Sequence, residues 1–351
     1  MKKLSIIVPI YNMEKYIDRC VQSVLDAKLN DSIEILLIND GSKDKSQEIM
    51  DSYYKQHPDI IRVFNKENGG HGSVINFGID KSEGKYLKIL DSDDYFNTEN
   101  LKKLIAFLDK NEEVDLIITS YYKVFENSCL KQKLNIKSNE IMPLESLYSI
   151  FSGNSNKENI NYVPMAMVTY KTKVLKNCKK RLLEKTYYVD TEFNVFYINE
   201  VNDFIYLDLP IYNYCIGRAD QSISSQSFVN NYNDHSKVVH SIIEYYNTHL
   251  FKTKIHKLVT EIMIVRLLNT QYAIYGYHLK KGYNSQLQKV MLDFDQWLKQ
   301  ESPYLYDKMA IRKYISLGRK HNFNKRIYRP FFFKLAIAWE MMRGTWKKYN
   351  I

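Results

Sequence analysis

The chain has 351 residues, of which 45% are hydrophobic, so it can bury a substantial core and has room for two domains. Its formal net charge of +10 favours an anionic partner, although a solvated lysine surface would account for the same balance. The four cysteines are scattered without C-x-x-C spacing, which argues against a zinc site or a disulfide framework and favours a reducing cytosol. No apolar run is long enough to span a bilayer, and Pro9 interrupts the first one too early for a signal peptide.

The first third of the chain alternates short apolar runs with amphipathic helical stretches. We expect strands over residues 4–8, 33–38, 60–64, 86–90 and 114–119. We expect helices over residues 14–27 and 46–56, a short helix capped by Ser73, and another capped by Thr98. This alternation predicts an α/β fold with a doubly wound, mainly parallel sheet.

Four polar segments follow the ends of the expected strands. They are Pro9–Asn12, Asn39–Ser42, Asn68–Gly72 and Asp91–Asp94. In doubly wound sheets, ligands bind beyond the carboxyl ends of the strands. One polar turn at that edge would mean little, but four that converge there predict a shared site.

The last of these segments, Asp91-Ser92-Asp93-Asp94, places three carboxylates in one turn. Mg²⁺ and Mn²⁺ bind through one or two carboxylates together with phosphate oxygens of a substrate. The turn therefore predicts a metal that holds a diphosphate. A solvated turn that precedes a helix would use the same residue types, and the acidic motif alone does not separate the two interpretations.

The site is not a dinucleotide site of the usual kind, because no G-x-G-x-x-G follows the first strand and no G-x-x-x-x-G-K-[ST] occurs. The first turn instead offers the ring of Tyr11, which can stack on a base. Asp40 can accept hydrogen bonds from an imide or a ribose hydroxyl. Gly69 and Gly70 allow a close approach of the backbone.

The stretches SIIVPIYN, INDGS, NGG and DSDD, at these spacings, resemble the family 2 glycosyltransferases, which have the GT-A fold. The resemblance is specific to about residue 125 and looser to about residue 225. It implies that a uridine nucleotide sugar contacts Pro9, Tyr11, Glu14, Asp40, Asn68, Gly70, Asp91 and Ser92. It also implies that Asp91 and Asp93 hold a metal, with Asp94 as a substitute ligand. Asn39, where the family usually has Asp, and His71 depart from the common pattern.

The transfer of a sugar to an acceptor needs a general base. The acceptor hydroxyl is a poor nucleophile until a carboxylate takes its proton. The family resemblance implies that this base is Asp190, with Glu192 in reserve; Val189 replaces the first residue of the usual acidic pair. Capping of the helix that begins near Glu192 is the alternative role of Asp190. The polar residues 126–160 are interpreted as a flexible excursion on the acceptor side.

The last third of the chain has helical periodicity, so we expect a transferase domain over residues 1–225 and a helical domain over 226–351. Arg218 has two candidate roles, a clamp on an anion and a surface ion pair with Asp220. The basic and aromatic tail after Gly318 suits either contact with the inner face of a membrane or docking on its own domain. The helices also offer a contact for a homo-oligomer.

Together these features predict an inverting, metal-dependent glycosyltransferase of the cytoplasm that uses a UDP-linked sugar with Mn²⁺ or Mg²⁺ as the cofactor. The acceptor would be a glycan, a glycoprotein, a lipid-linked molecule or a cell-wall polymer. A scaffold that binds a nucleotide sugar without turnover is the alternative, for which Val189 and Asn39 leave room. A nucleic-acid partner is not expected, since no nucleic-acid-binding module is present.

Overall fold

The computed structural model describes residues 2–110, 113–153, 155–217, 221, 227, 230–281 and 285–324. The chain divides into two compact units, one of residues 1–218 with 252–259 and one of residues 219–251 with 260–351. The boundary predicted at residue 225 lies outside the described residues and stays a prediction. Arg218, Asp220 and the tail beyond residue 324 also lie outside them.

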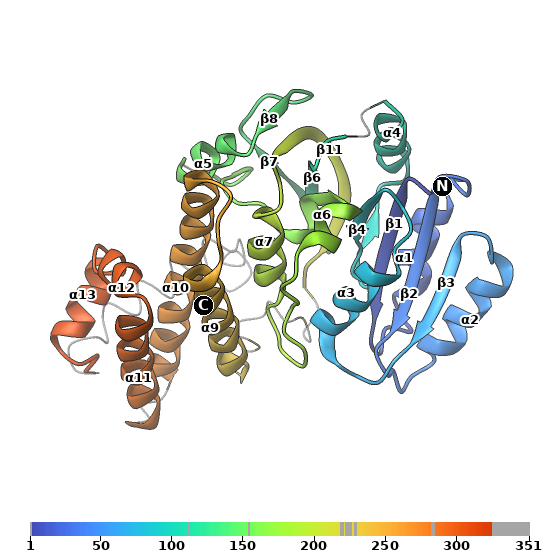
Figure 1. Ribbon diagram of the computed structural model, residues 1–351. Helices are drawn as coiled ribbons and strands as arrows, with labels where there is room; N and C mark the ends of the chain where they lie inside the picture. Colours follow the sequence, from blue (N-terminus) through green and yellow to red (C-terminus); the bar gives the residue numbers. More distant parts are fainter. Residues whose placement is uncertain are drawn as a thin grey trace. The chain divides into compact units, whose positions relative to one another are not determined.

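The first unit begins with the predicted parallel sheet. Strands pair in parallel in the order β3-β2-β1-β4, with bounds β1 Leu4–Ile10, β2 Ile33–Asn39, β3 Ile61–Asn65 and β4 Tyr86–Ile89. Helices α1 (Ile17–Leu25) and α2 (Ser46–Gln56) lead from β1 to β2 to β3, and α3 (Gly70–Lys81) returns the chain to β4. Because such crossovers are right-handed, the reversed direction puts α3 on the face opposite α1 and α2 (Figure 1). The predicted α/β fold with a mainly parallel sheet is confirmed.

Three boundaries differ from the sequence prediction. Strand β1 continues through Pro9, which pairs in register with Ile38, because the apolar run stays buried on both faces. Helix α3 begins at Gly70 rather than near Ser73. Helix α4 (Thr98–Leu108) is capped by Asn97, whose side chain accepts the N–H of Asn100 at 2.9 Å, so the prediction of a Thr98 cap was wrong.

The second half of this unit adds mixed strands to the sheet, which has 11 strands in the described residues. The order continues from β4 through β10, β6 and β11 to β5, and β6 and β11 are parallel. The remaining bounds are β5 Tyr95–Phe96, β6 Leu116–Phe125, β7 Ser128–Leu134, β8 Ile141–Pro143, α5 Glu145–Ser152, β9 Asn159–Ile160, η1 Met165–Met167, β10 Val168–Lys171, α6 Thr172–Asn177, α7 Asp190–Ile198 and β11 Asp203–Cys215. The prediction of a flexible excursion over 126–160 was wrong, because β7 pairs with β6 as a hairpin.

Lys88 is buried in β4, with 1% of its surface exposed. Its ammonium group donates to the carbonyl oxygens of Ala166 at 2.8 Å and Val168 at 3.1 Å. Burial lowers the pKa of Lys88 to about 7. This side chain therefore ties β4 to the segment that forms η1 and β10.

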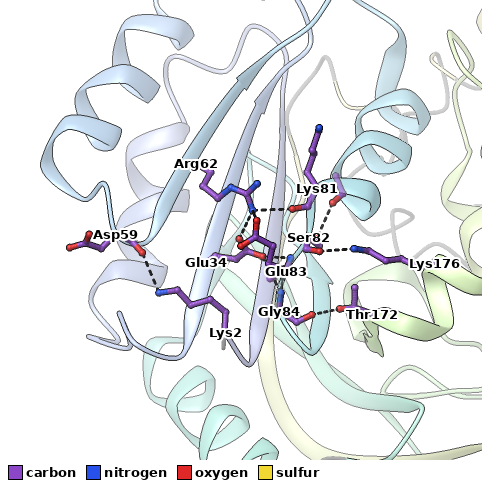
Figure 2. A network of polar contacts seen from close by, with 12 residues as sticks. Lys2, Glu34, Asp59, Arg62, Lys81, Ser82, Glu83, Gly84, Thr172 and Lys176 are labelled. Atoms are coloured by element: carbon purple, nitrogen blue, oxygen red, sulfur yellow. Dashed lines mark hydrogen bonds and ion pairs between the residues drawn. The ribbon is translucent and has the colours of Figure 1, made fainter.

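A polar network closes the amino-terminal edge of the sheet (Figure 2). The buried carboxylate of Glu34 accepts from Arg62 Nη1 at 2.8 Å and from the N–H groups of Glu83 at 2.6 Å and Gly84 at 3.1 Å. Burial opposes ionisation of Glu34, but these hydrogen bonds and one from Ser5 outweigh it and lower the pKa of Glu34. The network joins the starts of β1 and β2 to the turn before β4.

The second unit is helical in its described residues, with α9 Tyr232–Thr248, most of α10 Lys254–Lys281, α11 Ser285–Glu301, α12 Pro303–Met309 and α13 Lys313–Lys320. His235 is buried and its Nδ1 lies 2.6 Å from Gln271 Oε1, while the ring of His240 lies against Trp297. Both histidines thus have packing roles. Among the described helices, none combines the length and apolarity needed to cross a bilayer.

Candidate active site

The register of the sheet brings the predicted segments to one edge. Ile10, the last residue of β1, pairs with Asn39 of β2, which pairs with Asn65 of β3. Strand β4 joins the other side of β1 in parallel, and the N–H of Leu90 donates to the carbonyl of Ile7 at 2.9 Å. The expectation that the four polar segments share the carboxyl edge is confirmed.

Asp40 holds the loop that follows β3. Its carboxylate accepts from Lys66 Nζ at 2.7 Å and from the N–H groups of Gly69 at 2.9 Å and Gly70 at 2.7 Å. Asn68 Nδ2 donates to the Asp40 carbonyl at 2.9 Å. Gly70 has φ +80°, a conformation that favours glycine. A carboxylate has about four acceptor positions, so one of those on Asp40 remains after these three donors.

The turns after β1 and β2 are fastened to each other. The N–H of Glu14 donates to Asp44 Oδ2 at 3.0 Å, and Glu14 Oε2 accepts the N–H of Lys45 at 3.0 Å. The carboxylate of Glu14 thus supports the second turn. Tyr11 stands at the end of β1 with 45% of its surface exposed, whereas Pro9 is buried in the strand. Of these three predicted residues, Tyr11 presents the most accessible side chain.

The acidic turn meets His71 from the first turn of α3. His71 Nε2 lies 3.0 Å from Asp91 Oδ1. Burial opposes protonation of His71, but the hydrogen bond with Asp91 and the charges of Asp91, Asp190 and Asp93 outweigh it and raise the pKa of His71. The loop positioned by Asp40 therefore continues directly into the carboxylate cluster.

The three aspartates of the turn have different surroundings. Asp91 and Asp93 are partly exposed, whereas Asp94 is fully buried and Ser92 is nearly so. Asp94 accepts from the hydroxyl of Tyr212 and the N–H of Cys215, each at 2.7 Å. Burial and the charges of Asp93 and Asp91 raise the pKa of Asp94 well above its ordinary value. The placement of Asp94 argues against the substitute-ligand role.

Asp190 is the first residue of α7 and is exposed, whereas Glu192 one half-turn later is fully buried. Glu192 Oε2 accepts the N–H of Leu183 at 2.9 Å. Val189 occupies the N-cap position of α7 and its side chain makes no capping hydrogen bond. Asp190 is the next residue, inside the helix, and therefore does not cap it. The charge of Asp190 acts on both His71 and Tyr214, together with the charges of Asp91 and Asp93, so the predicted base joins the acidic cluster.

The segment Leu182–Tyr188, which we call the strap, links Asp190 to the loop at Asp40. The N–H of Lys185 donates to the carbonyl of Gly69 at 2.5 Å, and the side chain of Asn76 bonds both the N–H and the carbonyl of Leu182. A Cβ at Gly72 would lie 2.1 Å from the carbonyl oxygen of Leu183. The strap and the start of α3 are therefore in backbone contact.

The oxygen donors at this edge fit a hard divalent cation. Asp91 and Asp93 offer partly exposed carboxylates in one turn. In the described part of the chain, no group of three His, Cys, Asp or Glu side chains forms a metal site by itself. Mg²⁺ and Mn²⁺ commonly take only one or two protein carboxylates and complete their shell with phosphate oxygens and water, so two aspartates suit such an ion.

Several residues of the site were missed by sequence reasoning. Tyr212 and Tyr214 of β11 both approach the acidic turn, and the charges of Asp94, Asp91, Asp190 and Asp93 act on Tyr214. Arg19 of α1 donates to the carbonyl of Asp93 at 2.6 Å. The one usable signal in the sequence was Pro210, because a proline within a sheet marks an edge or a bulge.

A family model described as glycosyl transferase family 2 matches residues 5–188. EpsJ of Bacillus subtilis, named an uncharacterized glycosyltransferase, is 40% identical over 120 residues, which are 34% of this chain and 34% of EpsJ. GlyG of Streptococcus pneumoniae, named a glycosyltransferase, is 38% identical over 125 residues, 35% of this chain and 40% of GlyG. GgaB of Bacillus subtilis, named a minor teichoic acid biosynthesis protein, is 34% identical over 115 residues, 32% of this chain and 13% of GgaB.

Solved structures match over more of the chain. Residues 1–349 of TarS from S. aureus, in complex with UDP-GlcNAc, superpose with a TM-score of 0.66 and 19% sequence identity. The match covers 97% of this chain and 92% of that one. At this identity the likeness shows a shared fold, in both the sheet and the helical part of the sequence.

Proposed function

We propose that this chain, which belongs to glycosyl transferase family 2 and has the GT-A fold, transfers a sugar from a UDP-linked donor to an acceptor hydroxyl with inversion. The observation that supports this most is the meeting of two kinds of carboxylate at one sheet edge. Asp91 and Asp93 follow a strand, Asp190 begins a helix about a hundred residues later, and all three charges act on His71. That arrangement suits a displacement that needs both a charged leaving group and a base.

The nucleotide would lie along the ends of β1, β2 and β3. The exposed ring of Tyr11 offers a stacking surface for uracil, and the remaining acceptor position of Asp40 suits an imide or a ribose hydroxyl. The loop from Asn68 to Gly70 brings its backbone beside Asp40. Pro9 would act here by shaping the first turn, Glu14 by fastening the first turn to the second, and Ser92 by shaping the acidic turn.

The diphosphate would lie over Asp91 and Asp93, which would hold the Mn²⁺ or Mg²⁺. A divalent cation there supplies neutralisation of the charge that develops on the departing diphosphate. His71 lies beside Asp91 Oδ1, where the hydrogen bond to Asp91 and the nearby carboxylates raise the pKa of His71 and so favour its protonated form.

Asp190 would act as the general base. The acceptor oxygen forms a bond to the anomeric carbon while the bond from that carbon to the phosphate oxygen breaks. The hydroxyl proton passes to the Asp190 carboxylate, and UDP leaves with the electron pair of the broken bond. A single in-line displacement of this kind inverts the anomeric centre.

The acceptor would be a sugar or polyol hydroxyl of a cell-envelope polymer. The support is the name of the relative GgaB, a teichoic acid biosynthesis protein, and the family itself. The matched segments span about a third of EpsJ and less of GgaB, so the remainder of those proteins gives no guide to the acceptor of this one.

A thermal-shift screen with UDP-, GDP- and dTDP-sugars, with and without Mn²⁺, tests the donor. We expect UDP-sugars with Mn²⁺ to raise the unfolding temperature, since a ligand that binds only the folded state stabilises it. Release of UDP in the presence of an acceptor would then separate a transferase from a binding scaffold. Stabilisation by none of the donors, or binding without any turnover across acceptors, would contradict the proposal.

A further inference from the structure

Strand β11 reaches the acidic turn through an irregularity in its pairing. Leu207 pairs with Thr119 of β6, but the next pair along the ladder joins Tyr212 to Tyr121. Residues 208–211 of β11, which include Pro210, therefore lie opposite the single residue Ser120 of β6. Bulges of this sort re-aim side chains and are frequent beside active sites.

The re-aimed segment is fastened to the chain that follows the acidic turn. The N–H of Asn97 donates to the carbonyl of Ile211 at 2.6 Å, and Asn100 Nδ2 donates to the carbonyl of Pro210 at 2.8 Å. Strand β5 pairs with β11 directly after the turn, with Phe96 opposite Tyr212. The bulge and the turn thus have a fixed relative position.

The hydroxyl of Tyr212 lies between the two ends of the turn. It donates to Asp94 Oδ2 at 2.7 Å, and Asp91 Oδ2 lies 3.3 Å away as a second acceptor. The same hydroxyl accepts the N–H of Asp91 at 3.2 Å. Because Tyr212 is 1% exposed, water does not compete for these contacts.

Asp94 completes this arrangement from the buried side. Its Oδ1 accepts the N–H of Cys215, so its two oxygens are used by two residues of β11. The third acidic side chain of the turn is thereby an anchor, which leaves the partly exposed Asp91 and Asp93 to face a ligand.

We propose that Tyr212 is a positioning residue that sets the orientation of Asp91 for the metal diphosphate. The inference rests on the proposed function, because it assigns Asp91 to the cation. Groups that orient a metal ligand from behind change metal affinity by about 10- to 100-fold when they are removed. Tyr212 contacts the ligand residue through both its backbone N–H and its carboxylate, which suits that role.

The test compares Tyr212→Phe with Tyr206→Phe as a matched control. Tyr206 lies on the same strand, is also 1% exposed, and its hydroxyl bonds the N–H of Leu134 and Asp208 rather than the acidic turn. Calorimetry would measure Mn²⁺ binding to the full chain in saturating UDP, and donor KM and kcat would be measured alongside. Both variants should lose thermal stability, since each loses a buried hydroxyl.

We expect the Mn²⁺ dissociation constant to rise about 10- to 100-fold in Tyr212→Phe and to stay within about twofold of wild type in Tyr206→Phe. Equal affinity in Tyr212→Phe and wild type would overturn the inference, as would equal weakening in the two variants. If Tyr212→Phe fails to fold, Asp94→Asn serves instead, with about tenfold weakening expected and unchanged affinity overturning the inference. A wild-type chain that binds neither UDP nor Mn²⁺ would overturn the proposed function itself.

Discussion

Asp190 and Glu192 are two residues apart on α7 and have opposite surroundings. Asp190 is exposed at the start of the helix, and its charge acts on His71 and Tyr214. Glu192 is fully buried and accepts the N–H of Leu183 at 2.9 Å. The sequence favours Asp190 as the base with Glu192 in reserve, and the two residues have different surroundings in the structure.

Asp190→Asn should lower kcat by about 10²- to 10⁴-fold while UDP binding persists, because the amide cannot take the acceptor proton. Glu192→Gln should instead lower the unfolding temperature, since it weakens a buried hydrogen bond to Leu183, and should leave the rate per folded molecule within a fewfold of wild type. Transfer kinetics and thermal unfolding of the two purified variants check this. A larger rate loss in a well-folded Glu192→Gln would reverse the assignment.

Asp93→Ala should reduce transfer by at least about 100-fold without unfolding the chain, because the cation would lose a carboxylate that neutralises the leaving group. Excess chelator should have a similar effect on wild type. Glu113→Ala is the matched control, since it removes an exposed carboxylate that pairs with Lys171 at the surface. Undiminished turnover in Asp93→Ala or in chelator would refute the metal role.

Glu34→Gln should lower the free energy of unfolding at pH 7 by about 1–3 kcal/mol, because it weakens a buried, charge-assisted network. The pKa of Glu34 is lowered in the folded state, so its stabilising effect is present above the unfolded value of 4.5 and is lost as pH falls through the folded value. The difference between variant and wild type should therefore shrink below about pH 4.5. Urea unfolding at pH 7, 5, 4 and 3 measures it; a difference that grew on acidification would contradict the expected sign.

Lys88→Met should reveal a trend of the same sign at higher pH. The folded protein releases the Lys88 proton near pH 7, while the unfolded chain keeps it until about 10.5. Between those values the unfolded state binds more protons, so the free energy of unfolding of wild type should rise relative to the variant, by up to ~1.4 kcal/mol per pH unit. Chemical denaturation of both proteins at pH 6, 8 and 9.5 tests this. A flat difference would show that Lys88 titrates alike in the two states.

Gly72→Ala should destabilise the chain by about 1–3 kcal/mol, because the new methyl group would lie 2.1 Å from the carbonyl oxygen of Leu183. Gly153→Ala is the control, since its nearest atoms, the carbonyl oxygens of Ile150 and Ser149, would be 3.3 Å away. Thermal unfolding compares the two variants. Equal and small losses would mean that the strap yields to the methyl group.

The parallel half of the sheet could be predicted because its signal is local. Short runs rich in Ile, Val and Leu, such as Ile35–Ile38, indicate buried strands, and parallel strands place their carboxyl ends on one edge. The same reasoning predicts that the acidic turn lies at the same edge of the sheet as Asp40. The individual roles of the predicted site residues stay predictions until the variants above are measured.

The parts of the fold and of the site that could not be predicted depend on contacts between segments that are distant in the sequence. Strand β7 carries only a weak apolar signal, because its first two residues are exposed and Gln132 takes one of its buried positions. The contacts of Tyr212 could not be predicted, because its partners Asp91 and Asp94 are about 120 residues away in the sequence. Periodicity predicts which face a residue occupies, but it does not reveal a change of register such as the one around Pro210.

The strap restricts how the loop at Asp40 can move relative to the start of α7. The carbonyl of Gly69 bonds the N–H of Lys185, and the segment leading from there to Asp190 contains Tyr188 in a left-handed conformation, with φ +68°. Moving the loop at Asp40 away from Asp190 would therefore require the hydrogen bond between Gly69 and Lys185 to break.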